Sequence, residues 1–209
     1  MTLADQTIAG INVSRETYDD LLVFRDLVIK WTPKINLIAP STVPDLWERH
    51  IVDSAQLYPL ASEPFAHWLD LGSGGGFPGI VMAIFGKRYA PDAKFTLIES
   101  DQRKATFLRT AARDLALNAT VLSERIDQVA PQEADIVSAR ALAPLSALIE
   151  MTSRHLKSDG RALFHKGKGA AAEIADARRN WSFALEQHDS FTDPAARLLI
   201  IQRISRVGD

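Results

Sequence analysis

The sequence predicts an α/β fold: a mostly parallel seven-stranded sheet with an antiparallel final strand, preceded by an N-terminal helical region. Three observations lead to this prediction. From Trp68 onward, short apolar runs alternate with helical patterns, which is typical of parallel strands joined by helices. One apolar run leads directly into a glycine-rich turn, and the last two runs have no full-length helix between them. The first feature favours a parallel sheet, and the last favours an antiparallel end to it.

The first sixty residues carry two helical patterns. Residues 14–31 place apolar side chains at helical spacing after Ser14, a residue suited to capping, and Pro33 predicts the end of this helix. A second apolar stripe covers 45–58, and Pro64 is expected to close the region. We therefore expect a helical extension over 1–64 and a second domain over 65–209.

The predicted elements of the second domain follow from its apolar runs. Short runs predict strands over 67–71, 95–98, 134–137 and 162–164. Helical patterns between them predict helices over 78–88, 101–115 and 144–156. Right-handed crossovers between parallel strands are then expected. The runs 183–188 and 198–204 predict a closing antiparallel hairpin.

Composition excludes several classes of protein. The chain has 209 residues, 46% of them hydrophobic, and a formal net charge of −2. It contains no cysteine, which excludes disulfides, thiolate metal sites and a cysteine nucleophile. No apolar run is long enough to span a membrane, and the first residues lack the pattern of a secretory signal, so we expect a cytoplasmic protein. Any nucleic-acid binding must rest on a local basic surface.

The strongest local feature is the loop Gly72-Ser-Gly-Gly-Gly-Phe77-Pro-Gly79, between a predicted buried strand and a predicted helix. Gly72, Gly74 and Gly76 allow a ligand to approach backbone N–H groups, and Pro78 suits the first turn of a helix. A glycine pattern alone is weak evidence, because a tight strand-to-helix turn uses the same residues.

Two acids strengthen the prediction of a ligand site. Asp70 ends the first strand, where it can meet the amino group of an amino-acid ligand. Glu99 ends the second strand, at the spacing from which an acid bonds ribose hydroxyls in dinucleotide-type folds. Glu99 can alternatively cap the following helix. The two ligand classes left open are a nicotinamide dinucleotide and S-adenosylmethionine.

The wording Asp-Leu-Gly-x-Gly-x-Gly resembles motif I of the Rossmann-like class I S-adenosylmethionine-dependent methyltransferases. Dinucleotide sites usually have an apolar residue at the position of Asp70, and the chain lacks a Tyr-x-x-x-Lys pair for hydride transfer. The pattern therefore favours S-adenosylmethionine over a nicotinamide cofactor.

Most of the chain resembles the bacterial RsmG (GidB) methyltransferases, which modify N7 of a guanine in the decoding-region loop of 16S ribosomal RNA. The resemblance implies a cofactor pocket and a substrate, 16S ribosomal RNA or the small ribosomal subunit. The implied pocket residues are Gly72, Phe77, Glu99, Ile126, Asp127 and Arg140. The motifs that carry the resemblance are Trp31 with Asn36-Leu37, Arg49-His50-Ile-Val-Asp53-Ser54, the glycine loop, Glu99-Ser-Asp-Gln-Arg-Lys104, Arg125-Ile126-Asp127, Ser138-Ala-Arg140-Ala and Lys166-Gly167.

The chemistry of the chain agrees with a guanine N7 target. Methylation of a pyrimidine C5 in RNA generally uses a cysteine nucleophile, which this chain lacks. Amino-group methylation commonly uses an Asp or Asn-Pro-Pro-aromatic motif, and this chain has Ser138-Ala-Arg140-Ala at that place. Ring nitrogens and hydroxyls remain. Guanine N7 exposes a lone pair, so the enzyme must align and desolvate it without a dedicated base.

Three residues are our candidates for the catalytic group: Arg140, Lys166 and His50. Arg140 ends a predicted strand, where open α/β sheets bind ligands. Lys166 belongs to a basic run over 154–168 that, with Arg197, Arg203 and Arg206, suits one phosphate-facing surface; an ordinary solvated face is the open alternative for the run apart from Lys166. His50 lies on an apolar helical stripe, so a core role is an open alternative. We expect a monomer that binds no metal and no membrane.

Overall fold

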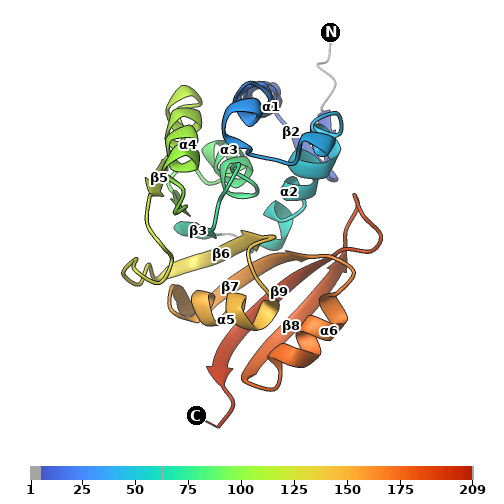
Figure 1. Cartoon of the computed structure of the whole chain (residues 1–209), viewed down its shortest axis with the longest axis vertical. Helices are drawn as coiled ribbons and strands as arrows, with labels where there is room; N and C mark the ends of the chain where they lie inside the picture. The colour runs from blue at the N-terminus through green and yellow to red at the C-terminus, as the bar shows by residue number, and fades with distance from the viewer. Residues whose placement is uncertain (1–5, 63, 209) are drawn as a thin grey trace.

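A seven-stranded sheet separates two layers of helices in the computed structural model, which describes residues 6–62 and 64–208 (Figure 1). The strand order is β5-β4-β3-β6-β7-β9-β8. Neighbours from β5 to β7 are parallel, whereas β9 is antiparallel to both β7 and β8. The predicted sheet, its antiparallel final strand and its closing hairpin are therefore confirmed. The strands are β3 (His67–Leu71), β4 (Lys94–Ile98), β5 (Ala119–Leu122), β6 (Ala134–Arg140), β7 (Leu156–Lys166), β8 (Trp181–Asp189) and β9 (Arg197–Arg206).

Helices cover both faces of this sheet because the side chains of each central strand alternate between two apolar cores. On one face, Trp68 of β3 joins the core formed with α1, α3 and α4. On the other face, Leu69 and Leu71 join the core formed with α5 and α6. The helices are α1 (Arg15–Ile35), α2 (Asp53–Ala55), α3 (Gly79–Tyr89), α4 (Gln102–Asp114), α5 (Leu145–Ser153) and α6 (Ala170–Ala177).

The long N-terminal helix α1 begins as predicted and ends later than predicted. The Ser14 hydroxyl accepts a hydrogen bond from the backbone N–H of Thr17, as a helix cap does. Pro33 lies inside the last turn, and the helix continues to Asn36, which caps it in the left-handed conformation. A proline removes one N–H donor near the end of a helix without preventing one further turn.

The predicted second helix over 45–58 is wrong in detail. The chain instead forms a π-helical segment η2 (Trp47–Val52), the single turn α2, and a 3-10 turn η3 (Tyr58–Leu60). The apolar stripe is still buried, because Leu46, Ile51 and Leu57 pack into the core. The wider turn of η2 carries Arg49 and His50, and such segments occur frequently at functional sites.

Some elements have no counterpart in the prediction. A short hairpin joins β1 (Gln6–Ile8) to β2 (Ile11–Val13), and helix α6 precedes β8. The sequence predicts seven strands in the sheet but gives no range for strand β5. Its run of four residues alternates only partly between buried and exposed positions, so the pattern is weak. No helix in the described part of the chain has the length and apolar character needed to cross a membrane.

Candidate functional site

A cavity of about 680 Å³ opens beside the glycine loop, where β3, β4 and β6 end. This edge of a parallel sheet is where open α/β folds bind their ligands. We call it the loop cavity. The predicted site residues that line it are His50, Gly72, Gly74, Phe77, Glu99, Ile126, Asp127 and Arg140.

The glycines of the loop have different tasks. Gly72, Gly74 and Gly76 all have positive φ angles. A Cβ atom on Gly74 would face open space, with its nearest neighbour, the Gly72 carbonyl oxygen, 3.8 Å away. A Cβ atom on Gly76 would lie only 2.8 Å from Ile80 Cγ1 and 2.9 Å from Phe24 Cζ. Gly76 therefore allows close packing of the loop on the core, and it does not line the cavity.

Glu99 connects the end of β4 to the glycine loop. Its side chain is nearly buried, at 8% exposure, and still borders the loop cavity. One carboxylate oxygen accepts the backbone N–H of Gly74 at 2.8 Å, and the other accepts the N–H of Asp101 at 2.7 Å. Asp101, rather than Glu99, caps α4 by accepting the N–H groups of Arg103 and Lys104. Glu99 thus fixes the loop and keeps lone pairs free toward the cavity.

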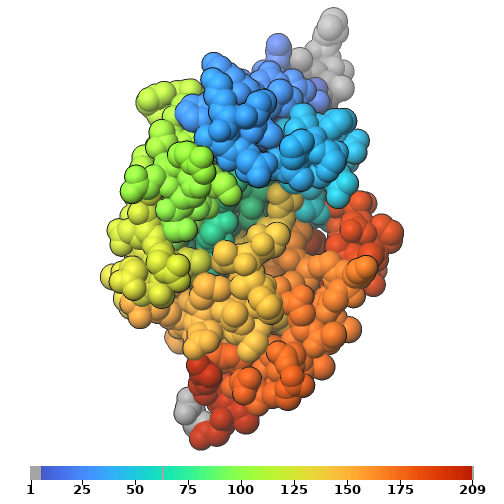
Figure 2. Space-filling view, in the orientation of Figure 1, coloured from blue at the N-terminus to red at the C-terminus, as the bar shows by residue number. Residues whose placement is uncertain are grey.

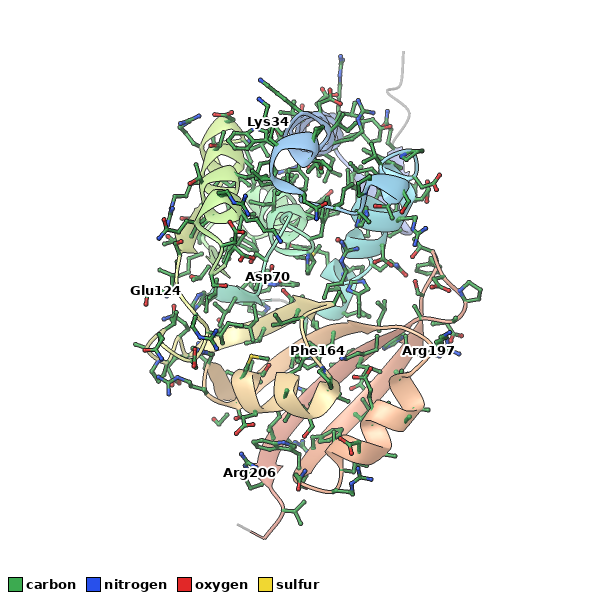
Figure 3. All side chains as sticks on the ribbon, viewed as in Figure 1. Lys34, Asp70, Glu124, Phe164, Arg197 and Arg206 are labelled. Carbon is green, nitrogen blue, oxygen red and sulfur yellow. The ribbon has the colours of Figure 1, made fainter. Side chains whose placement is uncertain are left out.

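Asp70 lies behind the loop, on β3 beneath α3, and does not line the cavity (Figure 3). Its side chain is 1% exposed, and one oxygen accepts the Ser138 hydroxyl at 2.6 Å. A Cβ atom on Gly79 would lie 2.6 Å from the other oxygen. Burial raises the pKa of Asp70 to about 6. In this geometry Asp70 joins β3 to the start of α3, and the expected contact with a ligand amino group is not available.

Ile126 and Asp127 lie in the connection between β5 and β6. The Ile126 carbonyl is hydrogen-bonded to the His155 ring at 3.2 Å, which ties this connection to the start of β7. The exposed Asp127 forms an ion pair with Arg125 at 3.2 Å. The half-buried Ile126 side chain offers an apolar surface to the cavity, and Asp127 offers an acceptor at its rim.

Arg140, the last residue of β6, is held by residues of the N-terminal region. Its Nη1 donates to the Arg49 carbonyl and to the Asp53 carboxylate, each at 3.1 Å. Its Nη2 donates to His50 Nδ1 at 2.7 Å. The guanidinium carbon also lies 5.2 Å from the centre of the Phe77 ring. The planar group is thereby fixed at the mouth of the loop cavity.

His50 is fixed in one tautomer by these contacts. Arg140 can only donate, so Nδ1 accepts, and Nε2 carries the proton that it donates to the Thr42 hydroxyl at 2.9 Å. Burial, and then the positive charge of Arg140, lower the pKa of His50 to about 4. The ring is therefore neutral near pH 7, and both of its nitrogens are engaged.

A second cavity, of about 790 Å³, adjoins the first. We call it the Lys166 cavity. The two cavities share the 140–143 segment, which forms the wall between them. Lys166 Nζ donates to the Ala143 carbonyl at 2.7 Å and to Glu173 at 2.8 Å. Lys166 therefore holds this wall in place from the end of β7.

The predicted single phosphate-facing surface is wrong. Lys157 and Lys166 stand near opposite ends of β7, and Arg197 and Arg206 lie at opposite ends of β9 (Figure 3). Lys157 is paired with Asp135, and His155 is buried. The charges in the sequence are contiguous, but an extended strand separates its ends by about 3.3 Å per residue.

Sequence reasoning assigned no role to Asp53 or Gln56, and it placed His165 only in the basic run over 154–168. Asp53 accepts from Arg140 and Thr192, and its carbonyl is 2.7 Å from His165 Nε2. Asp53 belongs to the motif over 49–54, and that motif is the signal in the sequence that could have identified it. The partners of these side chains lie 87 to 139 residues away in the chain, so no local pattern joins them. Among residues 6–62 and 64–208, no group of metal-ligating side chains could hold a metal ion.

The sheet order, the glycine loop and the acid at the end of β4 define a Rossmann-like class I S-adenosylmethionine-dependent methyltransferase. Solved structures share this fold. A SAM-dependent methyltransferase from Aquifex aeolicus superposes with a TM-score of 0.59 at 13% identity, covering 85% of this chain and 97% of that one. TYW2 of M. jannaschii, in complex with AdoMet, gives 0.57 at 13% identity and 76% coverage of each chain.

The family follows from sequence comparison. The GidB family model, described as rRNA small subunit methyltransferase G, matches residues 17–199, and the chain belongs to this family. The Ribosomal RNA small subunit methyltransferase G of Cereibacter sphaeroides is 53% identical over 99% of this chain and 100% of its own length. The protein of the same name from Ruegeria pomeroyi is 48% identical over 94% and 96%. The nicotinamide alternative is thereby excluded, and S-adenosylmethionine is the cofactor.

Proposed function

We propose that this protein transfers a methyl group from S-adenosylmethionine to N7 of a guanine in 16S ribosomal RNA. The observation that carries the proposal is the match of residues 17–199 to the rRNA small subunit methyltransferase G family. The pair of adjoining cavities with one shared wall, the 140–143 segment, agrees with it. Methyl donor and acceptor must meet in line at a short distance, and two sites with a common wall provide that meeting point.

The loop cavity is the proposed donor site. The open space above Gly74 and the remaining lone pairs of Glu99 suit a ribose with two hydroxyl groups. Ile126 offers an apolar surface to an adenine, and Asp127 offers an acceptor for its amino group. Two N–H groups of Arg140 have no partner in the described residues, so they suit the carboxylate of the methionine moiety. Asp70 and Gly76 do not line the cavity, and they support the glycine loop by packing behind it.

The Lys166 cavity is the proposed acceptor site. When bound, the cofactor supplies an electrophilic methyl group on a sulfonium. The N7 lone pair of the guanine would supply the electrons of the new bond to the methyl carbon, and the sulfur would keep those of the bond that is lost. No proton has to leave N7, so no general base is needed. Arg140, His50 and Lys166 therefore act by holding the shared wall and excluding water.

The test is a methylation assay on unmethylated small-subunit ribosomal RNA and on small subunits. Borohydride and aniline cleave RNA at 7-methylguanosine, so primer extension locates the product. A single cleavage site is expected. Incorporated methyl groups without cleavage, or cleavage at many guanines, would contradict the N7 assignment. RNA binding without methyl transfer would contradict the methyltransferase activity.

The proposal also covers the setting of the reaction. We expect the protein to act in the cytoplasm, where its RNA substrate is assembled, and as a monomer. The extension over 1–64 contributes His50 and Asp53, which hold Arg140 of the wall, and 65–209 contributes the sheet and the glycine loop. Light scattering after size-exclusion chromatography tests the monomer, since a particle of twice the chain mass would contradict it.

A further inference from the structure

The β8–β9 loop, residues 190–196, stands at the rim of the Lys166 cavity. Thr192, Asp193 and Ala196 of this loop line that cavity together with Arg49 and Lys166. In Figures 1 and 2 the loop projects at the margin of the molecule, beside the α2 region. A substrate entering the cavity therefore passes this loop.

The loop is fastened to the N-terminal region by side-chain hydrogen bonds. Gln56, only 3% exposed, accepts the backbone N–H of Phe191 at 2.6 Å and donates to the Ser190 hydroxyl at 3.2 Å. The Thr192 hydroxyl donates to Asp53 at 2.6 Å. Buried amide and carboxylate partners of this kind hold a loop in one conformation. The same Asp53 carboxylate holds Arg140, so the loop and the shared wall have a common anchor.

Phe191, at the tip of this fixed loop, is 79% exposed. Exposed phenyl surface is unfavourable in water. Several hydrogen bonds fix this loop in a conformation that keeps the ring exposed. Such a loop is suited to contact a partner through the ring. Phe191 does not line the cavity, whereas its neighbour Thr192 does, so the ring lies just outside the rim.

The charges nearby identify the chemistry of that partner. Arg49 lines the cavity, and within the described ranges no hydrogen bond or ion pair engages its guanidinium. Lys166 lies at the same cavity but is buried and paired with Glu173, and Glu48 and Asp193 also line the cavity, so the attraction for an anion is local to Arg49. Cations attract the phosphates of a nucleic acid, and unstacked RNA bases stack on aromatic side chains.

We propose that Phe191 stacks on a nucleobase that flanks the target guanine in the RNA. The proposal rests on the proposed function and adds a docking residue to it. The guanine enters the Lys166 cavity, and the neighbouring base remains outside on the phenyl ring. Stacking there keeps the RNA strand from closing over the extruded guanine, so Phe191 acts as a positioning residue.

The test compares Phe191→Ala, Phe191→Leu and Phe191→Trp with the parent. Val23→Ala, which removes an exposed apolar side chain from α1, is the matched control. Equilibrium binding uses a fluorescent hairpin with the sequence of the methylated 16S loop, without cofactor. Methylation of small ribosomal subunits gives KM and kcat. Calorimetry gives the affinity for S-adenosylmethionine, and light scattering reports self-association of the protein.

The Ala variant is expected to weaken RNA binding by about 5- to 150-fold, the range for one base–aromatic stack. The loss should appear in KM, with kcat, donor affinity and thermal stability unchanged. The Trp variant should bind at least as tightly as the parent, and the Leu variant should resemble Ala. The salt dependence of binding should not change, because the ring has no charge.

Unchanged RNA affinity in the Ala variant would overturn the proposal, as would equal affinity of the Leu variant and the parent. A change confined to self-association would assign the ring to contacts between copies of the chain and would also overturn it. If the parent itself does not methylate RNA, the proposed function fails, and the binding assay still reports on Phe191. The two failures are therefore distinguishable.

Discussion

Glu99→Gln is the substitution that tests the donor site most directly. The carboxylate has four acceptor positions, and two of them accept the N–H groups of Gly74 and Asp101. Two positions remain for ribose hydroxyls. Glutamine has one acceptor oxygen, and its NH₂ group must face one of the two backbone donors. The variant therefore loses one hydrogen bond to a backbone N–H of the protein and one hydrogen bond to a ribose hydroxyl of S-adenosylmethionine.

The two losses have separate magnitudes. An unpaired backbone N–H at a nearly buried site costs about 1 to 3 kcal/mol of folding free energy. A lost hydrogen bond to a charged acceptor costs about 1.5 to 3 kcal/mol of binding free energy, which is about 10- to 150-fold in the dissociation constant. Chemical denaturation measures the first and isothermal titration calorimetry with S-adenosylmethionine measures the second.

Glu124→Gln is the control for charge alone. Glu124 borders the same cavity and is exposed, and its carboxylate forms no hydrogen bond or ion pair within residues 6–62 and 64–208. Its loss should cost less than about tenfold in donor affinity, and salt should reduce the effect. Equal effects of the two substitutions, or unchanged affinity in Glu99→Gln, would refute the assignment of Glu99 to ribose.

Further predictions concern the loop, the shared wall and pH. Gly74 and Gly76 both have positive φ, so alanine at either position should cost about 1 to 2 kcal/mol of unfolding free energy. Gly76→Ala should lose about 1 to 3 kcal/mol more through overpacking, whereas Gly74→Ala should also lower the affinity for S-adenosylmethionine; equal loss of stability would contradict this. Lys166→Ala should reduce methyl transfer about tenfold or more, because it releases the wall, whereas Lys157→Ala should change it little; similar rates would contradict this. Burial lowers the pKa of His50 from 6.5 to about 4, so its stabilisation is complete above pH 6.5 and is lost as pH falls toward 4. Thermal unfolding of the parent should therefore lose more stability over this range than His50→Gln, and parallel losses would contradict the shift.

The elements that the sequence predicts well are those with a strong local pattern. The strand and glycine loop at 67–79 combine a buried run with residues of special conformation, and the structure has both at that place. The segment 45–58 shows the limit of the method. Its apolar positions fit a helix and are buried, but periodicity cannot distinguish an α-helical from a π-helical turn over so few residues.

The site was predictable where the sheet itself brings residues together. Glu99 follows β4 and Arg140 ends β6, and these two parallel strands flank β3. The approach of both residues to one cavity therefore follows from the strand order. Asp70 lies two residues earlier, in register with Leu97 and Ser138, so its side chain lies beneath the loop, where a Cβ atom on Gly79 would meet it. How far a strand residue lies from the edge of the sheet depends on register, which the motif does not specify.

Asp53 explains why the N-terminal region belongs to the site although it lies outside the sheet. One of its oxygens accepts from Arg140, in the wall between the cavities, and the other accepts from Thr192, in the loop that presents Phe191. Both bonds join buried or partly buried groups, so one carboxylate fixes the loop and Arg140 relative to each other. A reaction without a base depends on alignment, and a shared anchor for the two binding surfaces supplies it.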